Sequence, residues 1–591
     1  MKPATMAENW STGYVREVEK TPSWWRDDAR PWHSGAWTLD LRGDEIADIA
    51  FDGVVVVRAI RAAVRDAGWL TVPTTVVATR IGADSIELNL EQVGLGARVT
   101  GTVTILTSGP ELRVSWRAVS HDAFRTCRIG LVALHPASWA GTAVTIDHTD
   151  GTREESAFPR DIRPHQPLMD IRRLTAIRDG IRFELAFTGD VFETEDQRNW
   201  TDASFKTYSR PLALPYPYDL PAGEQVDQSI TIRADRVKAA AAVHDGPQLL
   251  ELVAGGTFPE IGVEASTASE PQAASADGGF RVVELDLRTP TWRAALHRAA
   301  ADGRPLVVHL VVPASDAPLT EAAAALAALA VPSTRVAAFD AVEHVSDAAV
   351  ISRTRAALAR VGLDVTVIGG ARSHFTELNR ERERISRDVD GYAVTLTPLF
   401  HTLDTEQLVE SLTMQRVIAA QTASYAAGRP VHVGPVALRP RFNNVATSPE
   451  RLPTRTDLAE GYGAAFTGAT DDRQATPELA AWTIASAAAL AVPTTASVSF
   501  FETTGPRGIR AADGTPRPVL AAISALAALT GAELLHQPAA AEVWAIGART
   551  AEKTTILVAN PTSVDRRVTV RIPGRDTPAT IPADSWIRIE G

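Results

Sequence analysis

Apolar and polar residues alternate in short runs along the first 240 residues of the chain. A period of two is typical of β-strands with one buried face, and turn residues separate the runs. The pattern therefore predicts an antiparallel β-sandwich over residues 1–240. The clearest runs are 54–60, 85–93, 98–107, 111–119, 128–135, 180–189 and 227–235.

From about residue 246 the pattern changes, and apolar strand-like runs alternate with helical runs rich in alanine, leucine and arginine. Eight strands joined by helical crossovers are typical of a (β/α)8 barrel, which we expect over residues 246–515. The expected strands are 260–266, 281–288, 305–312, 334–341, 364–370, 392–400, 430–440 and 497–505, and the clearest helices are 291–301, 320–329, 347–362 and 405–428.

The last part, residues 516–591, begins with one more helical run at 517–535 and continues with short strand-like runs. We expect this helix to be followed by a small C-terminal β-domain. The predicted fold class is therefore multidomain, α/β plus all-β, with a central TIM-like barrel flanked by an N-terminal β-sandwich and a small C-terminal β-domain.

Composition and charge exclude several classes of partner. The net charge is −12, and no basic run with interleaved aromatic residues is present, so we expect no nucleic acid and no anionic membrane as partner. The single cysteine, Cys127, rules out a disulfide framework within the chain and a cysteine metal cluster. No run reaches 18 apolar residues, and the first 20 residues lack the apolar core of a signal peptide. We therefore expect a cytoplasmic protein.

Active sites of such barrels lie at the carboxyl ends of the strands. Glu377 follows the fifth expected strand, and Glu502 ends the eighth. Two carboxyl groups that face each other across a pocket can divide the roles of acid and base when their surroundings separate their pKa values. We interpret the two as the candidate catalytic pair. Two alternatives stay open, since Glu377 can cap the following helix and Glu502 can pair with Arg507.

Other polar residues at the same strand ends form a candidate substrate-binding set. Arginines can hold a nearby carboxylate ionised, and His401 can act as a base, a donor to a bound oxygen or a metal ligand. The set consists of Asn379, His401, Asp404, Arg439, Arg441, Asn443, Arg473 and Arg507.

Cofactor motifs are missing from the sequence. A metal site built from His309, His401 and Asp404 would lack a ligand spacing such as HExxH. No phosphate-binding glycine loop and no GxSxG nucleophile elbow occurs, which disfavours nucleotide use and a serine-hydrolase mechanism. We expect no metal and no other cofactor, and a small molecule as the substrate.

A polar stretch in the expected sandwich, ETEDQRNWTDASFKTYSRPL at 193–212, is unusual for a surface loop. It can extend over the barrel mouth and form a wall of the site, or it can be an interdomain network of paired charges packed by Trp200 and Phe205. Under the first interpretation its substrate-binding or site-bracing residues are Glu195, Asp196, Arg198, Asn199, Asp202 and Lys206.

Several stretches together resemble the bacterial D-apionate lactonase family. The longest is 193–212, and the resemblance spans roughly residues 120–510. The shorter stretches are FPRDIRPHQPLMDIRRL (158–174), RIGLVALHP (128–136), HFTELNR (374–380), LRPRFN (438–443) and FFETTGPRG (500–508). The resemblance implies hydrolysis of D-apionolactone to D-apionate in apiose catabolism, and a barrel with flanking β-domains that is related in fold to glycoside hydrolases.

Two stretches depart from the family pattern. After the sixth strand the chain reads TPLFHTLD, which keeps His401 and Asp404 but lacks a Pro-Gln-Val-His-Ala-like flank. The tip of the eighth strand lacks a tryptophan before Arg507. Both changes concern a pocket wall, so they bear on the exact substrate more than on the reaction class.

Hydrolysis of a lactone needs a base for water, donors for the oxyanion and an acid for the departing ring oxygen. We assign the acid and base roles jointly to Glu377 and Glu502, and oxyanion stabilisation to His401, Asn379 or an arginine such as Arg441. Two rival functions stay open. One is a glycoside hydrolase that uses the same two glutamates on a furanosyl or pyranosyl unit, and the other is a carbohydrate-binding protein on an inactive barrel. The sequence does not indicate an oligomeric state.

Overall fold

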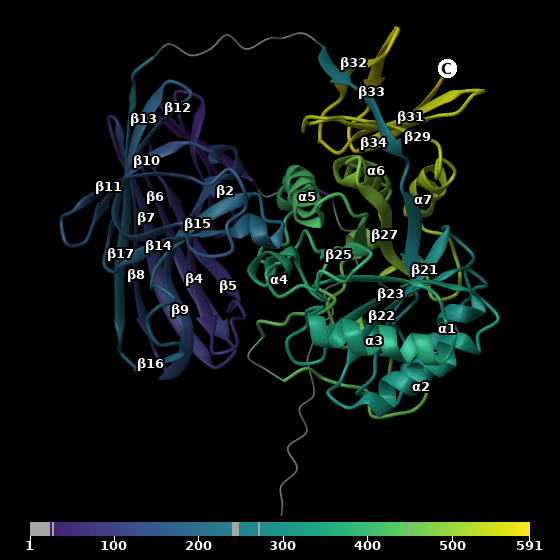
Figure 1. Ribbon diagram of the computed structural model, residues 1–591. Coiled ribbons are helices and arrows are strands. Elements are labelled where there is room, and N and C mark those ends of the chain that lie inside the picture. The colour runs from purple at the N-terminus through teal and green to yellow at the C-terminus, as the bar shows by residue number, and fades with distance from the viewer. Residues whose placement is uncertain (1–23, 26–28, 239–246, 270–271, 447–448) are drawn as a thin grey trace, which may run out of the picture.

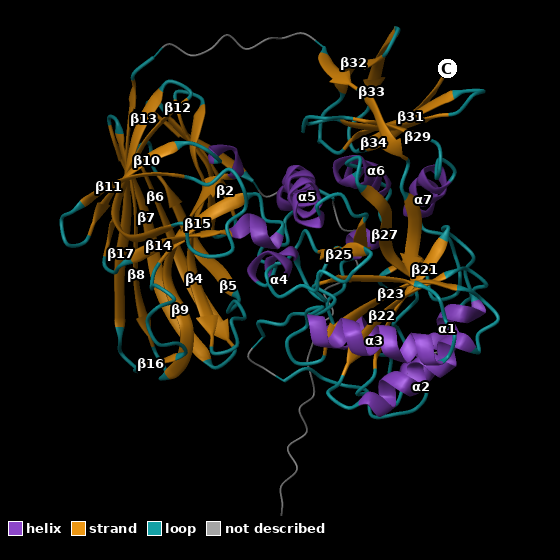
Figure 2. Cartoon of the chain, in the orientation of Figure 1, coloured by secondary structure: helices purple, strands orange, loops and turns teal. Residues whose placement is uncertain are grey.

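The structure is a computed structural model that describes residues 24–25, 29–238, 247–269, 272–446 and 449–591. Its parts are an N-terminal β-sandwich, a central barrel and a C-terminal β-domain (Figure 1). The barrel and the C-terminal β-domain lie next to each other, and the sandwich lies beside both (Figure 2).

In the described residues of the N-terminal part, hydrogen bonds join seventeen antiparallel strands into one folded sheet around a large hydrophobic core. In β8, Leu112, Val114 and Trp116 are buried while Arg113 and Arg117 point to solvent, as the period of two predicts. The strands are β1 Arg30–Ser34, β2 Trp37–Arg42, β3 Glu45–Phe51, β4 Val54–Asp66, β5 Thr74–Ile81, β6 Ser85–Gly94, β7 Ala97–Ser108, β8 Glu111–Ser120, β9 Phe124–Pro136, β10 Ala143–His148, β11 Arg153–Ala157, β12 Leu168–Arg178, β13 Ile181–Thr188, β14 Phe192–Asp196, β15 Ser204–Tyr208, β16 Tyr218–Leu220 and β17 Gln225–Arg236.

The central part is a closed barrel of eight parallel strands, which confirms the eight strands expected from the sequence. Pairing of the first strand with the last closes it. The strands are β20 Glu260–Glu264, β21 Phe280–Asp286, β22 Leu306–Val312, β23 Ser333–Asp340, β24 Thr366–Gly370, β25 Gly391–Leu396, β26 Val431–Val436 and β27 Thr495–Thr504, followed by the short β28 Gly508–Arg510.

Helices follow most barrel strands and cover the outside of the barrel (Figure 2). The link from β20 to β21 has no helix among its described residues, so the strand–helix alternation is incomplete there. The helices are α1 Trp292–Ala301, α2 Asp316–Ala327, α3 Ala348–Arg360, α4 Phe375–Arg380, α5 Thr405–Ala426, α6 Glu478–Leu490 and α7 Val519–Ala527.

The C-terminal β-domain takes strands from both sides of the barrel in the sequence. Its five-stranded sheet has the order β19-β29-β30-β31-β34, and its three-stranded sheet the order β18-β32-β33. The strands are β18 Gln248–Glu251, β19 Val253–Thr257, β29 Glu533–His536, β30 Trp544–Arg549, β31 Thr554–Asn560, β32 Arg566–Ile572, β33 Arg575–Ile581 and β34 Ser585–Glu590.

Two expected boundaries need correction. The start of the barrel at residue 246 included β18 and β19, which pair with C-terminal strands instead. The expected helix 517–535 ends with α7, because Gly531 adopts a left-handed turn conformation (φ +83°) and β29 follows. A local apolar pattern does not reveal which distant strand a segment pairs with, so the first boundary could not be read from periodicity, whereas Gly531 was a sequence signal for the second.

Helix α6 joins the barrel to the C-terminal β-domain. Every residue from Leu479 to Leu490 is buried, because the barrel covers one side of the helix and β30, β31 and β34 cover another. A helix that is apolar on all sides is stable in water only when it is enclosed in this way. The barrel and the inner face of this sheet therefore share one hydrophobic core.

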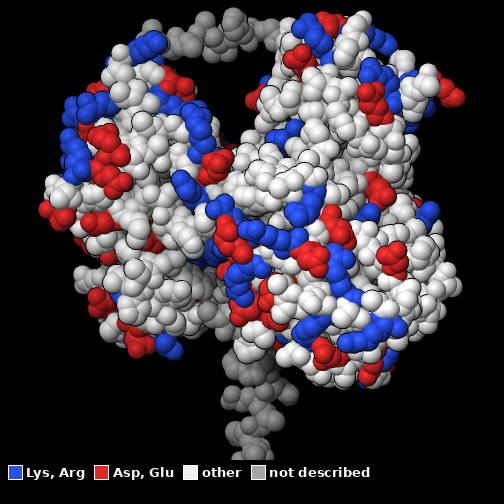
Figure 3. Space-filling view, viewed as in Figure 1, with Lys and Arg blue, Asp and Glu red and all other residues white. Residues whose placement is uncertain are grey.

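The sandwich contacts the barrel through a short 3-10 helix, η2 (Gln197–Trp200), which packs against α4. On the face in Figure 3, acidic and basic side chains are interspersed, and many of them gather where the sandwich meets the barrel. In the described parts of the chain, no helix is long and apolar enough to cross a membrane.

Candidate active site

Two glutamates end neighbouring strands at the mouth of the barrel. Glu264 is the last residue of β20 and Glu502 lies near the end of β27, and their Cα atoms are register partners. The register shifts between Gly262 and Glu264, as at a β-bulge. Such irregularities often redirect a side chain beside an active site. Both glutamates are almost completely buried.

The residue before Glu502 has an unusual backbone conformation. Phe501 is buried and has a φ of +52°, in the left-handed region that bulky residues rarely adopt. Residues held in this region cluster at active sites, where the surrounding structure enforces them. The conformation therefore marks the end of β27 as a candidate functional position.

Arginines and backbone donors hold the two carboxylates. Glu502 accepts hydrogen bonds from the backbone N–H of Thr267 at 3.0 Å and from its hydroxyl at 2.8 Å. The Nε atom of Arg507 lies 3.2 Å from Glu502, as the alternative pairing predicted. Arg441 forms a two-pronged ion pair with Glu264, with its Nε atom 2.8 Å from the carboxylate.

Burial and the neighbouring charge change the acidity of Glu264. Burial raises its pKa, and the charge of Glu502 raises it further, whereas Arg441 and Arg507 lower it. The net effect is a pKa of about 7 for Glu264. A carboxyl group that holds a proton near neutral pH therefore lies beside a second carboxylate that accepts three hydrogen bonds or ion-pair contacts.

A small, narrow pocket lies against both glutamates. Arg439 and Arg507 also line it. Arg507 fixes two of its walls, because it donates to the carbonyl of Ala469 at 2.5 Å and to that of Arg439 at 3.2 Å. Arg473 pairs with Asp471 of the same wall at 2.7 Å. Four of the residues expected from the sequence, Glu502, Arg439, Arg441 and Arg507, thus meet at one mouth.

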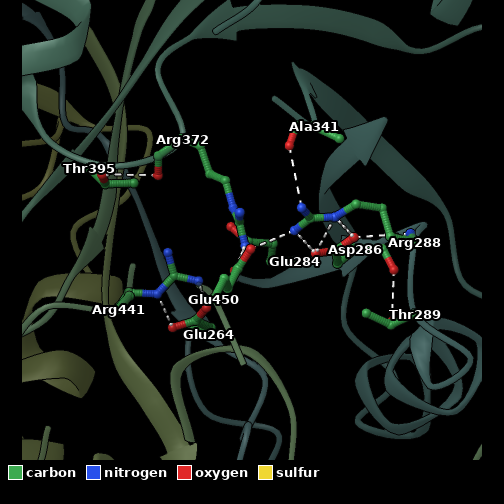
Figure 4. Close-up of polar contacts among 10 residues, drawn as sticks. All are labelled: Glu264, Glu284, Asp286, Arg288, Thr289, Ala341, Arg372, Thr395, Arg441 and Glu450. Carbon is green, nitrogen blue, oxygen red and sulfur yellow. Dashed lines mark hydrogen bonds and ion pairs between the residues drawn. The ribbon is translucent and has the colours of Figure 1, made fainter. Parts of the chain in front are cut away.

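A second charged network lies beside the Glu264–Arg441 pair (Figure 4). Arg372, after β24, is 2.9 Å from Glu284 of β21 and 3.0 Å from Glu450. Arg288 is 2.6 Å from Glu450 and 2.5 Å from Asp286. Alternating charges therefore line the carboxyl ends of strands on opposite sides of the barrel.

The carboxylate of Glu284 is held ionised inside this network. Burial alone would raise its pKa, but Arg372 and Arg441 outweigh that effect and lower the pKa of Glu284 to about 2. Glu284 and Glu264 are both buried glutamates at the barrel mouth, yet their pKa values shift in opposite directions. The difference gives the mouth one permanently charged carboxylate and one that can exchange a proton near pH 7.

Glu377 lies in α4 and caps that helix, as one of the two alternatives predicted. Its Oε2 atom accepts from the hydroxyl of Ser373 at 2.5 Å and from the backbone N–H of His374 at 2.9 Å. Its Oε1 atom is buried without a partner, and burial raises the pKa of Glu377. Among the described residues, no hydrogen bond or ion pair links Glu377 to Glu502. A catalytic role for Glu377 stays a prediction.

Part of the polar stretch 193–212 forms a network between domains. Asp196 pairs with Arg198 at 2.7 Å inside the sandwich. Asn379 of α4 donates to the side-chain oxygen of Asn199 at 2.9 Å and to the carbonyl of Ile162 at 3.0 Å. All four side chains are buried. The contact of Asn199 with Asn379 matches the interdomain interpretation, whereas Asp196 and Arg198 pair with each other inside the sandwich.

The rest of the stretch forms a separate cluster that reaches a barrel loop. Lys206 is 2.6 Å from Glu195, which also accepts from the indole of Trp200 at 3.3 Å. Asp202 lies 2.6 Å from the Nδ1 atom of His401, on the loop after β25. The sandwich therefore presents charged groups to the carboxyl-end face of the barrel.

Two further expected residues have local contacts. Asp404 immediately precedes α5, and Asn443 accepts from the backbone N–H of Val445 in a turn. Among the described residues, no group of three or more His, Cys, Asp or Glu side chains is arranged to hold a metal ion.

Two functional candidates, Glu264 and Glu284, were not predicted, and Asp202 was predicted without its partner. Glu264 lies two residues before the end of the first expected strand, 260–266, where the rule applied to the other strand ends pointed to functional residues. Glu284 lies inside an expected strand, where a charged residue in an otherwise apolar run is itself a signal. No sequence signal links Asp202 to His401, because the two residues are 199 positions apart.

The fold is that of a barrel protein with flanking β-domains. Residues 20–237 match the model of the D-apionate lactonase N-terminal domain, and residues 258–531 match that of the D-apionate lactonase TIM barrel domain. The chain belongs to the D-apionate lactonase family. It is 28% identical over 561 residues to the D-apionate lactonase of Brucella anthropi, covering 85% of this chain and 88% of that protein. Family membership supports a hydrolase.

Solved structures give more remote likenesses. A GH30 endoxylanase from Clostridium papyrosolvens C71 is 10% identical with a TM-score of 0.37, covering 58% of this chain and 100% of that chain. A galactose mutarotase-like protein from Lactobacillus casei ATCC 334 is 10% identical with a TM-score of 0.26, covering 35% of this chain and 100% of that chain. Neither likeness is close enough to bear on function.

Proposed function

We propose that the protein hydrolyses a sugar-acid lactone, D-apionolactone, to the open acid at the barrel mouth. Family membership supports the reaction class, and the adjacent Glu264 and Glu502 support the site. The observation that carries the proposal is the difference between the surroundings of the Glu264 and Glu502 carboxyl groups. Glu264 has a pKa of about 7, while Glu502 accepts from Thr267 and pairs with Arg507. One carboxyl can donate a proton where the other can accept one.

In the proposed mechanism, Glu502 takes a proton from water as the water oxygen attacks the lactone carbonyl carbon. Arg507 and Arg439, which line the pocket, stabilise the negative charge on the carbonyl oxygen. When the bond from the carbonyl carbon to the ring oxygen breaks, Glu264 donates its proton to that oxygen. The product is the hydroxy acid. Solvent removes the proton from Glu502 and returns one to Glu264.

Glu377, the acid or base predicted from the sequence, stays a candidate because its buried Oε1 atom has no partner. Three isosteric variants separate the candidates, namely Glu264→Gln, Glu502→Gln and Glu377→Gln. We expect the first two to lower kcat for D-apionolactone by about 10²–10⁴-fold, the range typical of a lost acid or base. We expect Glu377→Gln, whose amide oxygen can still accept from the His374 N–H at the start of the helix, to lower kcat less than tenfold.

Lactone opening is followed by NMR above the spontaneous rate, with each variant checked by thermal melting. A drop of 100-fold or more in Glu377→Gln would restore the pair expected from the sequence. Near-full activity in both Glu264→Gln and Glu502→Gln would contradict the proposed mechanism. A parallel panel of aryl furanosides and pyranosides tests the rival function, because a released sugar without lactone opening would identify a glycoside hydrolase.

A further inference from the structure

His401 and Asp202 form a dyad across the domain boundary. The Nδ1 atom of His401 lies 2.6 Å from an Asp202 carboxylate oxygen. The Asp202 side chain is 4% exposed and that of His401 is 15% exposed. Asp202 directly follows Thr201, which ends η2 in a left-handed conformation (φ +69°) that is rare for a β-branched residue. The sandwich therefore uses a constrained turn to bring this carboxylate to a barrel loop.

The dyad fixes which imidazole nitrogen carries the proton. A carboxylate can only accept a hydrogen bond, so Nδ1 must be the donor. In the neutral ring, Nε2 is then a bare acceptor. No described residue donates to Nε2, and the ring is not fully enclosed. Packing orients the ring, because the rings of Phe400 and Trp200 contact it edge-on, with centroids 4.8 Å and 5.6 Å from the centroid of the imidazole.

Burial favours the neutral form of the His401 ring. Burial lowers the pKa of His401, and the nearby Asp202 raises it, but Lys206 and Arg65 lower it again. The net pKa of His401 lies below its usual value. The ion pair of Lys206 with Glu195 at 2.6 Å keeps that cation in place. A neutral ring with a free Nε2 accepts a hydrogen bond, so it cannot stabilise an oxyanion by donating one.

The His401 loop belongs to the same end of the barrel as the glutamate pair. It follows β25, as Glu264 and Glu502 end β20 and β27. Arg473 joins this loop to the pocket wall, since it donates to the carbonyl of Leu403 at 2.6 Å and to Asp471 at 2.7 Å. Arg473 therefore ties the His401 loop to Asp471 of the pocket wall, and His401 itself lies outside the residues that line the pocket between the two glutamates.

We propose that His401, positioned by Asp202 of the sandwich, accepts a hydrogen bond from a hydroxyl group of a polyhydroxylated lactone and so selects such lactones over unsubstituted ones. This inference rests on the proposed function and deepens it, because it names the feature of the substrate that is recognised. His401 contacts the substrate, and Asp202 is a positioning residue that sets the tautomer.

The decisive variant is Asp202→Asn. The asparagine amide can donate to Nδ1, which shifts the ring proton to Nε2 and turns the acceptor into a donor. We expect kcat/KM for D-apionolactone to fall at least about tenfold, the equivalent of one lost hydrogen bond. We expect kcat/KM for γ-butyrolactone, the same ring without hydroxyl groups, to change less than twofold. His401→Gln, whose amide oxygen can accept a hydrogen bond, should recover selectivity that His401→Leu loses.

Nitrogen-15 NMR of the imidazole gives a readout that does not depend on turnover. We expect the Nδ1-protonated tautomer in the wild-type protein and the Nε2-protonated one in Asp202→Asn. The matched control is Asp227→Asn, which removes an exposed carboxylate that pairs with Arg117 at 3.2 Å. It should alter neither the tautomer nor the selectivity.

Two results would overturn the inference. One is an equal fall for both lactones in Asp202→Asn, which would assign the dyad to the hydrolytic step or to folding. The other is an Nε2-protonated ring in the wild-type protein. If the wild-type protein opens no lactone, the proposed function fails, and the tautomer measurement still decides whether Nε2 is an acceptor.

Discussion

Arg441 is the residue on which the charge balance of the barrel mouth depends. It pairs with Glu264, and its charge also acts on Glu284. All three side chains are buried or nearly so. A buried ion pair is not in itself strongly stabilising, but removal of one partner leaves an uncompensated charge, which is costly. The same cation therefore supports the fold and sets the acidity of the proposed acid.

We predict that Arg441→Met destabilises the protein by about 3–5 kcal/mol at pH 8, the cost of a broken buried pair. The loss shrinks as the pH falls, because Glu264 then takes up a proton. The pKa of Glu264 in the folded protein lies above the unfolded value of 4.5. The cost of leaving the Glu264 carboxylate unpaired is therefore absent below pH 4.5 and grows as the pH rises. Thermal melting across pH 5–8 measures this. Arg117→Met, at an exposed pair, should leave the melting temperature unchanged, and a pH-independent loss in Arg441→Met would contradict the argument.

A buried histidine makes the sandwich sensitive to acid. His135 bonds the hydroxyl of Thr207 at 2.7 Å and stacks on Trp139, and its Nδ1 atom is buried without a partner. Burial lowers the pKa of His135 to about 3. The unfolded chain binds a proton near pH 6.5 that the folded chain does not, so stability is lost as pH falls below 6.5.

We predict that His135 contributes up to about 1.4 kcal/mol of this loss per pH unit below pH 6.5. His135→Gln keeps a partner for Thr207. Its melting temperature should fall less than that of the wild type between pH 7.5 and pH 5.5. Calorimetry of both proteins at the two pH values is the check. Parallel pH dependence in the two proteins would show that His135 is not the group responsible.

At the scale of elements, the eight barrel strands could be predicted because each is a short apolar run separated by a helical pattern. The sequence also led to Glu502, Arg439, Arg441 and Arg507, which lie at strand ends. The register shift beside Glu264 and the left-handed Phe501 could not be predicted, since tertiary contacts impose them. The pairing partners of β18 and β19 could not be predicted either, because the partner strands follow the barrel in the sequence and the local pattern of apolar residues does not identify them.

Helix α4 and η2 connect the sandwich to the barrel through a few buried polar groups. We predict that Asn379→Ala destabilises this contact by about 1–3 kcal/mol, because Asn199 and Ile162 each lose a hydrogen bond from Asn379. Hydrogen exchange should accelerate in α4 and in residues 193–208. Asn89→Ala removes a comparable bond to Thr102 inside the sandwich and should leave exchange in these segments unchanged. Unaltered exchange in Asn379→Ala would show that apolar packing alone holds the domains.

At the scale of the whole molecule, the barrel and the C-terminal β-domain form one structural unit. They share a core in which Trp544 and Leu557 of the sheet pack with the barrel helices, and α6 is enclosed between them. The sandwich has its own core. A contact between His401 of the barrel and Asp202 of the sandwich joins the two units.

We predict that a chain ending after residue 531 is insoluble, although it contains the entire barrel. Removal of β29–β34 leaves β18 and β19 without partners and uncovers one side of α6, and exposed edges and apolar surfaces promote aggregation. The soluble fraction after expression beside the full-length chain is the measurement. If the shortened protein is soluble and melts cooperatively, the barrel does not need strands β29–β34 to fold.

The position of β18 and β19 before the barrel also has a consequence for the order of synthesis. Both strands leave the ribosome ahead of the barrel, while their partners β29 and β32 come after it. At roughly 5–20 residues per second, the wait between them is on the order of tens of seconds. During that time two short edges stay open beside a nascent barrel. The two sheets can be completed only after the last barrel strand has been translated. An interrupted chain therefore exposes the unpaired edges of β18 and β19 to chaperones and proteases.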